Sequence, residues 1–322
     1  MKLTVAVIYG GRSGEHEISI RSAESIMSAL DPERYEIHRY FISKEGRWSP
    51  RPLYPEPKRN PEIDVVFPVL HGTFGEDGTM QGLLELADLP YVGPGVLASS
   101  AAMDKEVGKR LCREAGLAVV EYVIADANFD CSQNKLPFPL FVKPANLGSS
   151  VGISKARTCE ELHAAVKLAA QYDRKMIIER TIVGKELECA VLGNDDPVAS
   201  MPCEILPSRE FYDYEDKYLL DRTEFRIPAD LPAERIEEVK RAAVAAYKAL
   251  QCEGMSRVDF LLEAATDRLY INEVNTIPGF TSISMYPKMW EHSGLAYPKL
   301  LDRLIELALE RHERKKALRF TR

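Results

Sequence analysis

The chain has 322 residues, of which 45% are hydrophobic and 28% are charged, and its formal net charge is −7. This length accommodates two or three domains with sizeable cores. The negative charge argues against a general nucleic-acid-binding protein. No apolar run approaches the roughly 20 residues that a membrane-spanning helix needs. We therefore expect a globular protein with neither a nucleic-acid nor a membrane partner.

Strands and helices alternate through the first hundred residues. LTVAVIYGG (residues 3–11) is typical of a buried strand that ends in glycines, and it suits a signal peptide less well. Residues 15–30 carry an apolar stripe with helical spacing, and DVVFPVLHG (residues 64–72) is a second continuous apolar strand. This alternation predicts a parallel sheet with helices on its faces, forming a Rossmann-like α/β domain over residues 1–102.

A second unit is predicted over residues 103–185. MDKEVGKRLCREAGL predicts a helix closed by Gly116, and FPLFVKP predicts a strand that leads into a glycine–serine loop. Thr158 and Glu161 have the spacing of a capping box at the start of another helix. MIIERTIVGKELECAVLG then predicts two strands joined by a Val-Gly turn.

A third unit is predicted over residues 186–322. It contains strand pairs, a tyrosine-rich loop over residues 209–220, a long helix from about Ala233 to Leu250, and a C-terminal helix. Between these helices lie two strands that each contain an acid. The whole chain thus predicts an α/β domain followed by two α+β units.

The six cysteines stand singly at positions 112, 131, 159, 189, 203 and 252. They form no C-x-x-C pair, and the six histidines show no metal-ligand spacing either. A structural zinc site is therefore not expected. We interpret the cysteines as free thiols, mostly in the core, of a protein in a reducing compartment.

Two acid-bearing strands indicate a metal site. SRVDFLLE contains Asp259, and INEVNTIPGF contains Glu273 and Asn275, which point to the same side because strand side chains alternate. Hard oxygen donors without sulfur or imidazole suit magnesium or manganese, with substrate phosphates completing the coordination shell. The alternative is that these acids are unrelated and face solvent.

Two further segments have features of a nucleotide site. KPANLGSSVG (residues 143–152) lacks the Walker pattern, but its glycines free the backbone, its serines donate hydrogen bonds and Lys143 precedes them. An ordinary hairpin loop is the alternative. In IIERTIVGKE, Glu179 could accept a hydrogen bond from the amine of an adenine, and Glu186 could hold ribose hydroxyls.

Taken together, these motifs resemble the ATP-grasp superfamily, and more closely the D-alanine–D-alanine ligase family. The resemblance covers almost the whole chain. Its motifs, in order, are YGGRSGEHEIS, HGTFGEDGTMQGLLEL, YVGPG followed by MDK, VKPANLGSSVG, FYDYEDKY, RVDF and NEVNTIPGFTSIS.

The resemblance implies a nucleotide and metal site built on ten residues. The phosphate-contacting lysines would be Lys105 and Lys143, and Lys217 would also contact the nucleotide. The adenine and ribose pocket would contain Glu179, Arg180, Ile182 and Glu186. The ligands of two magnesium or manganese ions would be Asp259, Glu273 and Asn275. The family usually has Lys where Arg180 stands, but that contact is often made through the backbone.

The resemblance also implies a substrate site. Glu15 would meet the ammonium of a first D-alanine, with Ser149 and Tyr218 as its hydrogen-bonded partners. Arg257 would steady the transferring phosphate, and Gly279 would offer a backbone N–H to an oxyanion. The remaining residues are His71 near the first substrate, with a strand-end cap as its alternative role, and Ser284 and Met285 near the second substrate.

The implied reaction is ATP-dependent ligation of two D-alanines through an acyl phosphate, in the cytoplasm, by a homodimer. Segment 209–220 would form a lid, in which Tyr212 and Tyr214 are expected to pack. Rival interpretations remain. They are ligation to D-lactate or another ATP-grasp carboxylate–amine ligation, a dinucleotide-binding oxidoreductase, and a non-catalytic nucleotide sensor. The oxidoreductase is disfavoured because the full G-x-G-x-x-G pattern is missing.

Overall fold

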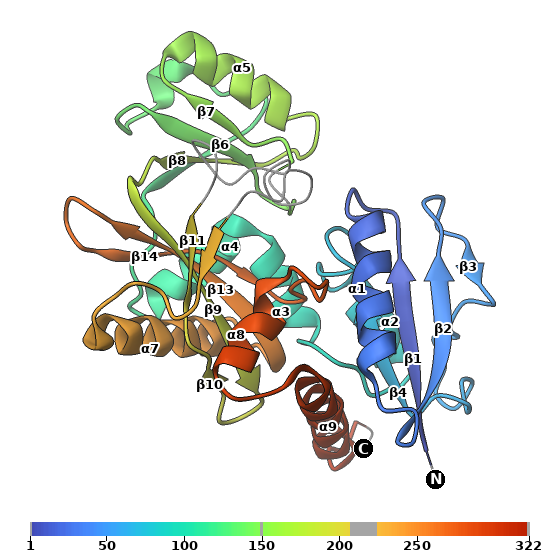
Figure 1. Cartoon of the computed structure of the whole chain (residues 1–322). Helices are drawn as coiled ribbons and strands as arrows, with labels where there is room; N and C mark the ends of the chain where they lie inside the picture. Colours follow the sequence, from blue (N-terminus) through green and yellow to red (C-terminus); the bar gives the residue numbers. More distant parts are fainter. Residues whose placement is uncertain (1, 149–150, 207–223, 321–322) are drawn as a thin grey trace.

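The computed structural model describes residues 2–148, 151–206 and 224–320, which contain three β-sheets with helices packed around them (Figure 1). Within these ranges no helix is both long and apolar enough to cross a membrane. The segment 209–220, interpreted above as a lid, lies outside the described residues.

The first sheet is parallel, as predicted, with one short antiparallel strand at its edge. Its strand order is β3-β2-β1-β4. Its strands are β1 (Leu3–Gly10), β2 (Tyr35–Ile42), β3 (Trp48–Ser49) and β4 (Val65–Val69). The helices of this region are α1 (His16–Ala29), α2 (Thr79–Leu86) and α3 (Val96–Met103). The apolar β1 and β4 are almost entirely buried, as continuous apolar strands of a parallel sheet should be.

The second sheet is antiparallel, with strand order β5-β8-β6-β7. Its elements are β5 (Tyr122–Ala125), the short helix η1 (Cys131–Gln133), β6 (Leu140–Pro144), β7 (Ser154–Ala156), α5 (Cys159–Ala169) and β8 (Met176–Arg180). Thr158 caps α5 by accepting a hydrogen bond from the backbone N–H of Glu161 at 3.3 Å, as the sequence predicts. The Glu161 carboxylate accepts from the N–H of Arg157 instead of closing the capping box on Thr158.

The third sheet runs β12-β11-β9-β13-β14, with β10 paired to β9. Its strands are β9 (Gly184–Gly193), β10 (Val198–Ala199), β11 (Cys203–Leu206), β12 (Glu224–Arg226), β13 (Gly254–Glu263) and β14 (Leu269–Asn275). The helices are α7 (Ala233–Ala249), α8 (Met285–His292) and α9 (Tyr297–Lys316). The strands β8 and β9 follow each other in sequence but do not form a hairpin, because they belong to different sheets. The residues between them therefore bridge the second and third sheets.

Two helices pack across the predicted units. The helix α4 (Lys105–Glu114) follows α3 and packs against β14, so that Ala102 and Cys112 share a core with Val258 of the third sheet. At the other end of the chain, α9 packs beside α1 and β4 of the first sheet (Figure 1). The limits of the three units, at residues 1–102, 103–185 and 186–322, remain predictions.

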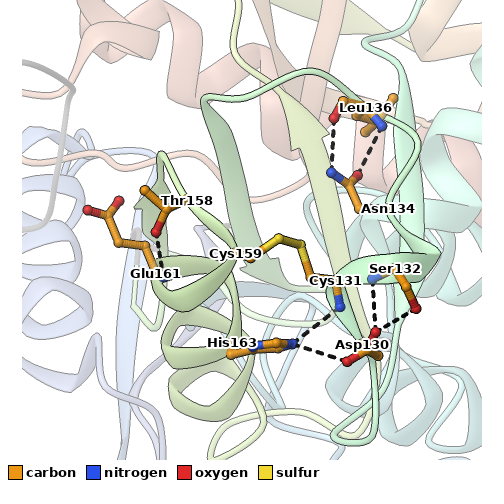
Figure 2. Close-up of a disulfide and its surroundings, with 9 residues drawn as sticks. All are labelled: Asp130, Cys131, Ser132, Asn134, Leu136, Thr158, Cys159, Glu161 and His163. Atoms are coloured by element: carbon orange, nitrogen blue, oxygen red, sulfur yellow. Dashed lines mark hydrogen bonds and ion pairs between the residues drawn. A yellow bond between two sulfur atoms is a disulfide. The ribbon is translucent and has the colours of Figure 1, made fainter.

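One interpretation of the cysteines is wrong. Cys131 and Cys159 form a disulfide that ties η1 to the first residue of α5 (Figure 2). His163, one turn along α5, also accepts a hydrogen bond from the backbone N–H of Cys131 at 3.2 Å. The sequence gives no sign of the pairing because the two cysteines lie 28 positions apart, and only folding of the intervening segment, which contains β6 and β7, brings them together. The other four cysteines are free and buried, as expected.

The disulfide can be tested by counting thiols. Protein purified without reductant and unfolded in guanidinium should react with four equivalents of a thiol reagent, because four cysteines are free. After reduction it should react with six. The Cys131→Ser variant, which cannot form the pair, should give the same count before and after reduction. Six reactive thiols in the unreduced wild type would contradict the disulfide.

Candidate active site

The pairing of β13 with β14 brings the predicted oxygen donors together. Asp259 lies opposite Glu273, and Arg257 lies opposite Asn275, in an antiparallel register that shifts just after Asp259. The Asn275 side-chain amide donates a hydrogen bond to Asp259 Oδ2 at 3.0 Å. The three side chains therefore form one group at this edge of the sheet.

The donor set suits a hard divalent ion that takes ligands from a substrate. Among the described residues there is no group of three or more His, Cys, Asp or Glu side chains that could hold a metal on its own. Two carboxylates and an amide oxygen leave coordination positions open. Magnesium, which commonly keeps waters and binds substrate phosphates, fits such an incomplete set.

Arg257 is held in place by two carboxylates. Its Nε and Nη2 atoms each donate a hydrogen bond of 2.7 Å to Asp259, and Nε lies 3.2 Å from Glu188 Oε1. Burial disfavours the charge of Arg257, but the attraction of Asp259 and Glu188 outweighs it and raises the pKa of the guanidinium well above its usual value. Glu188 was not predicted. It could have been found from β9, where it shares a face with Glu186.

A buried carboxylate between two lysines lies on the other side of the site. Glu179 of β8 contacts Lys143 of β6 at 2.6 Å and Lys109 of α4 at 2.7 Å. Burial alone would raise the pKa of Glu179, but the two lysines lower it to about 2. Lys109 was also missed by the sequence analysis. Its spacing of four residues from Lys105 on a predicted helix is the signal that could have revealed it.

The side chain of Arg180 lies away from this group. Its guanidinium pairs with Glu263 and donates a hydrogen bond to the Tyr270 hydroxyl at 3.1 Å. Successive strand residues point to opposite faces, so Glu179 and Arg180 must diverge. A nucleotide contact at Arg180 would thus be made by its backbone, as the sequence analysis expects.

Lys105 connects the acids to the glycine–serine loop. Its ammonium lies 3.3 Å from Glu273 Oε2 and donates a hydrogen bond to the Leu147 carbonyl at 2.7 Å. Gly148 follows Leu147 and approaches Glu15: a Cβ atom at Gly148 would lie 3.1 Å from Glu15 Oε2. A Cβ at Gly72 would lie only 2.7 Å from the same oxygen. Glycine at these positions makes room for the Glu15 carboxylate.

His71 is a buried residue in contact with two other segments. Its Nδ1 atom lies 3.1 Å from the Ile277 carbonyl oxygen, and its Nε2 atom lies 3.0 Å from Ser22 Oγ. Burial lowers the pKa of His71, but Glu76 and Glu15 together raise it above the usual value. Glu76 also accepts a hydrogen bond from the Gly72 N–H at 2.8 Å.

The turn after β14 brings the last predicted residues into the site. Ser284 packs so closely on Gly279 that a Cβ there would lie 2.6 Å from Ser284 Oγ. Ser284 Oγ also accepts a hydrogen bond from the Thr281 N–H at 3.0 Å, and Met285 beside it is buried. The segment is thus fixed by internal contacts.

All predicted site residues that the structure describes line two adjoining cavities, which share Lys105, Leu147, Gly148, Glu188 and Glu273. The larger cavity has a volume of about 960 Å³. Its predicted residues are Glu15, His71, Lys105, Arg257, Glu273, Asn275, Gly279, Ser284 and Met285. The second cavity is lined by Lys105, Lys143, Glu179, Arg180, Ile182, Glu186, Asp259 and Glu273. Ser149, Lys217 and Tyr218 lie outside the described residues.

Comparison with known proteins agrees with this geometry. The chain is 66% identical over 330 residues to the D-alanine–D-alanine ligase of Solibacter usitatus, and the match covers 100% of both chains. It is 50% identical to that of Thermoanaerobacter sp. (strain X514), over 98% of each. Among solved structures, the D-alanine–D-alanine ligase of Coxiella burnetii matches with a TM-score of 0.88 and 39% identity, covering 98% of this chain and 96% of that one. The structure of the VanG D-Ala:D-Ser ligase of Enterococcus faecalis matches with a TM-score of 0.87 and 37% identity, covering 96% of this chain and 100% of that one.

Family models match both halves of the chain. The model of the D-Ala–D-Ala ligase C-terminus matches residues 111–306, and that of the N-terminus matches residues 4–60 and 51–94. The solved relatives share the ATP-grasp fold predicted from the sequence. From its motifs, its fold and these similarities, the chain belongs to the D-alanine–D-alanine ligase family.

Proposed function

We propose that this protein joins two D-alanine molecules into D-alanyl-D-alanine with cleavage of ATP to ADP and phosphate, a step that supplies peptidoglycan precursors. The observation that carries the proposal is the convergence of the predicted nucleotide and substrate residues on two cavities that meet at Glu273 and Lys105. A phosphoryl group must pass from one substrate to the other, and adjoining cavities allow it.

In the first step, a carboxylate oxygen of one D-alanine attacks the γ-phosphorus of ATP, and ADP leaves. Glu15 binds the ammonium of this D-alanine and so directs its carboxylate inward. The product is an acyl phosphate, which converts a poor electrophile into a good one. Lys105, Lys143 and Arg257 stabilise the negative charge on the phosphate oxygens.

In the second step, the amine of the other D-alanine attacks the acyl carbon. The tetrahedral oxyanion accepts a hydrogen bond from the Gly279 N–H, and the C–O bond to phosphate then breaks while the amine loses a proton. Ser284 and the backbone at Met285 bind the carboxylate of this second substrate. Because an acyl phosphate hydrolyses readily, the site must exclude water until the amine attacks.

Two magnesium or manganese ions bound by Asp259, Glu273, Asn275 and the triphosphate would neutralise phosphate charge. On the nucleotide side, the Glu179 carboxylate is occupied by Lys109 and Lys143. Contacts to the adenine would therefore come from the backbone of residues 179–182, and Glu186 would bind the ribose.

We place the reaction in the cytoplasm, where ATP is supplied, and expect a homodimer. The decisive test is phosphate release with ATP, magnesium and D-alanine, together with identification of the dipeptide. L-Alanine should give no product. A dinucleotide-binding oxidoreductase or a nucleotide sensor would release no phosphate under these conditions.

The metal site can be tested with Glu273→Gln. The variant keeps the shape of the side chain but removes one negative charge from the proposed metal ligands. Loss of several kcal/mol of transition-state stabilisation should lower the rate of ligation on the order of a thousandfold. Asp267→Asn, which removes a carboxylate between the same two strands but outside both cavities, is the control and should remain active. Near-wild-type turnover of a folded Glu273→Gln protein would disprove the metal assignment.

The buried charges on the nucleotide side predict a pH dependence. Folding lowers the pKa of Glu179 from 4.5 to about 2, so its contribution to stability is complete above pH 4.5 and is lost as the pH falls toward 2. At neutral pH, Glu179→Gln should lower the free energy of unfolding by roughly 3–5 kcal/mol, because two lysines lose their buried partner. The penalty should shrink between pH 4.5 and 2 in urea titrations. A penalty independent of pH would show that the carboxylate charge is not what stabilises this group.

Acceptor choice can be tested at Tyr218. In the family, Tyr at this position accompanies D-alanine as the acceptor, whereas Phe occurs in relatives that also accept D-lactate. Tyr218→Phe should therefore form detectable D-alanyl-D-lactate, most clearly below neutral pH, where protonation of the competing amine suppresses the dipeptide. Loss of one neutral hydrogen bond predicts a shift in preference of roughly tenfold.

The measurement is product analysis with both acceptors present over a series of pH values. Tyr214→Phe, in the same segment, is the control and should leave the product ratio unchanged. If the wild type already favoured D-alanyl-D-lactate, the proposed acceptor would be wrong. If Tyr218→Phe left the ratio of D-alanyl-D-lactate to D-alanyl-D-alanine unchanged, Tyr218 would have only a packing role.

A further inference from the structure

The turn that contains Gly279 is held from both sides by Ser22 of α1 and by His71, which follows β4. The backbone N–H of Phe280 donates a hydrogen bond to Ser22 Oγ at 3.3 Å, and the carbonyl oxygen of Ile277 lies 3.1 Å from His71 Nδ1. Ser22 and His71 are themselves joined by a hydrogen bond of 3.0 Å. The contacts fix the peptide groups on either side of Pro278 and Gly279.

The chemistry of these groups gives the chain of hydrogen bonds a direction. A carbonyl oxygen can only accept, so His71 Nδ1 carries the hydrogen that points at Ile277. In neutral His71 the Nε2 atom is then an acceptor and the Ser22 hydroxyl donates to it, whereas in protonated His71 the Nε2 atom donates to Ser22 Oγ. Ser22 Oγ is left to accept from the Phe280 N–H. The three bonds are thus mutually consistent, and Ser22 is completely buried among them.

A second contact from α1 reaches Phe280 through Tyr297. Ser25 lies three residues after Ser22, on the same face of the helix, and its hydroxyl is 3.1 Å from the Tyr297 hydroxyl. Tyr297 donates to the Phe280 carbonyl oxygen at 3.4 Å, and the rings of Phe280 and Tyr297 stack with centroids 6.4 Å apart. Both the N–H and the carbonyl of Phe280 are therefore tied to α1.

We propose that Ser22 is a positioning residue for the acyl-transfer step, in which it fixes the orientation of the Gly279 N–H through the neighbouring Phe280 peptide. This inference rests on the proposed function, in which Gly279 donates to the tetrahedral oxyanion. A donor of this kind works only if it is held within about 0.5 Å of its productive position. Ser22 touches neither substrate nor nucleotide in this role.

The two chemical steps depend on Ser22 to different extents. Formation of the acyl phosphate uses the lysines, Arg257 and the acids of β13 and β14, none of which Ser22 contacts. Attack by the amine uses the Gly279 N–H. Loss of the Ser22 hydroxyl should therefore slow the second step selectively. The acyl phosphate would then have time to react with water, giving back D-alanine and phosphate.

The test compares ATP consumed with dipeptide formed. In Ser22→Ala, the kcat for dipeptide should fall roughly tenfold, the scale of one lost neutral hydrogen bond, and the ATP consumed per dipeptide should rise. KM for ATP should change little. Ser22→Thr retains a hydroxyl and should restore the ratio toward one ATP per dipeptide. Ser25→Ala, which removes the second contact to Phe280, should shift the ratio in the same direction.

Ser19→Ala is the matched control. Ser19 lies on the same helix, is completely buried, accepts a hydrogen bond from the Gly10 N–H at 2.8 Å and donates to the Val69 carbonyl. It does not contact the turn. This variant should lose stability but keep the wild-type ratio of ATP to dipeptide.

Two results would overturn the inference: an unchanged ratio in a folded Ser22→Ala protein, or an equal rise in Ser19→Ala. Either would show that Ser22 only stabilises the fold. Failure of the proposed function is distinguishable, because the wild type would then form no dipeptide at all.

Discussion

A slip of one residue between β13 and β14 would turn Glu273 and Asn275 to the opposite face of the sheet and away from Asp259. The pairing of these strands in a single register is therefore the constraint on which the site depends. The same register places Arg257 opposite Asn275. The pairing of β13 with β9 sets Glu188 opposite Asp259 and brings it to 3.2 Å from Arg257. Buried apolar residues that alternate with the acids, such as Val258, Phe260 and Val274, hold that register by filling the core below.

The charges of the site are balanced between elements that are distant in sequence. Arg257 binds Asp259, Lys105 of α4 lies beside Glu273, and Lys109 and Lys143 bind Glu179. In the proposed reaction, divalent ions would take over the carboxylates of Asp259 and Glu273. Arg257 and Lys105 would then be released to the phosphate oxygens. The ion pairs of this structure thus hold the lysine and arginine side chains in the site before the substrates bind.

Much of this could be read from the sequence because the signals are local. Continuous apolar runs predict the buried parallel strands, and strand alternation places Glu273 and Asn275 on one face. The resemblance to the family supplied the remaining site residues. Lys109, Glu188 and Ser22 were missed because their importance comes from partners on other elements: Glu179, Arg257 and Phe280. The sequence did not predict that β8 and β9 belong to different sheets, for a similar reason. A short turn between two strands predicts a hairpin, and only tertiary packing assigns the strands to two sheets.

The Cys131–Cys159 pair is a further case in which contact depends on tertiary folding rather than on spacing in the sequence. Neither cysteine has a neighbour in sequence that would mark it, and the contacts of His163 with the Cys131 N–H and with Asp130 form only when η1 lies against α5 (Figure 2). Such contacts follow from the fold and do not help to predict it.

The packing of α9 against the first sheet has a consequence for synthesis on the ribosome. Leu300, Leu304 and Ile305 of this last helix share one core with Val7 and Phe67, which belong to the first strands to emerge. One apolar face of the N-terminal sheet is covered by α1 but is therefore not fully covered until α9 has been made. Domains usually fold in the order in which they leave the ribosome. Here the first unit reaches its final packing only when α9 arrives, so part of its apolar surface is exposed to aggregation until then.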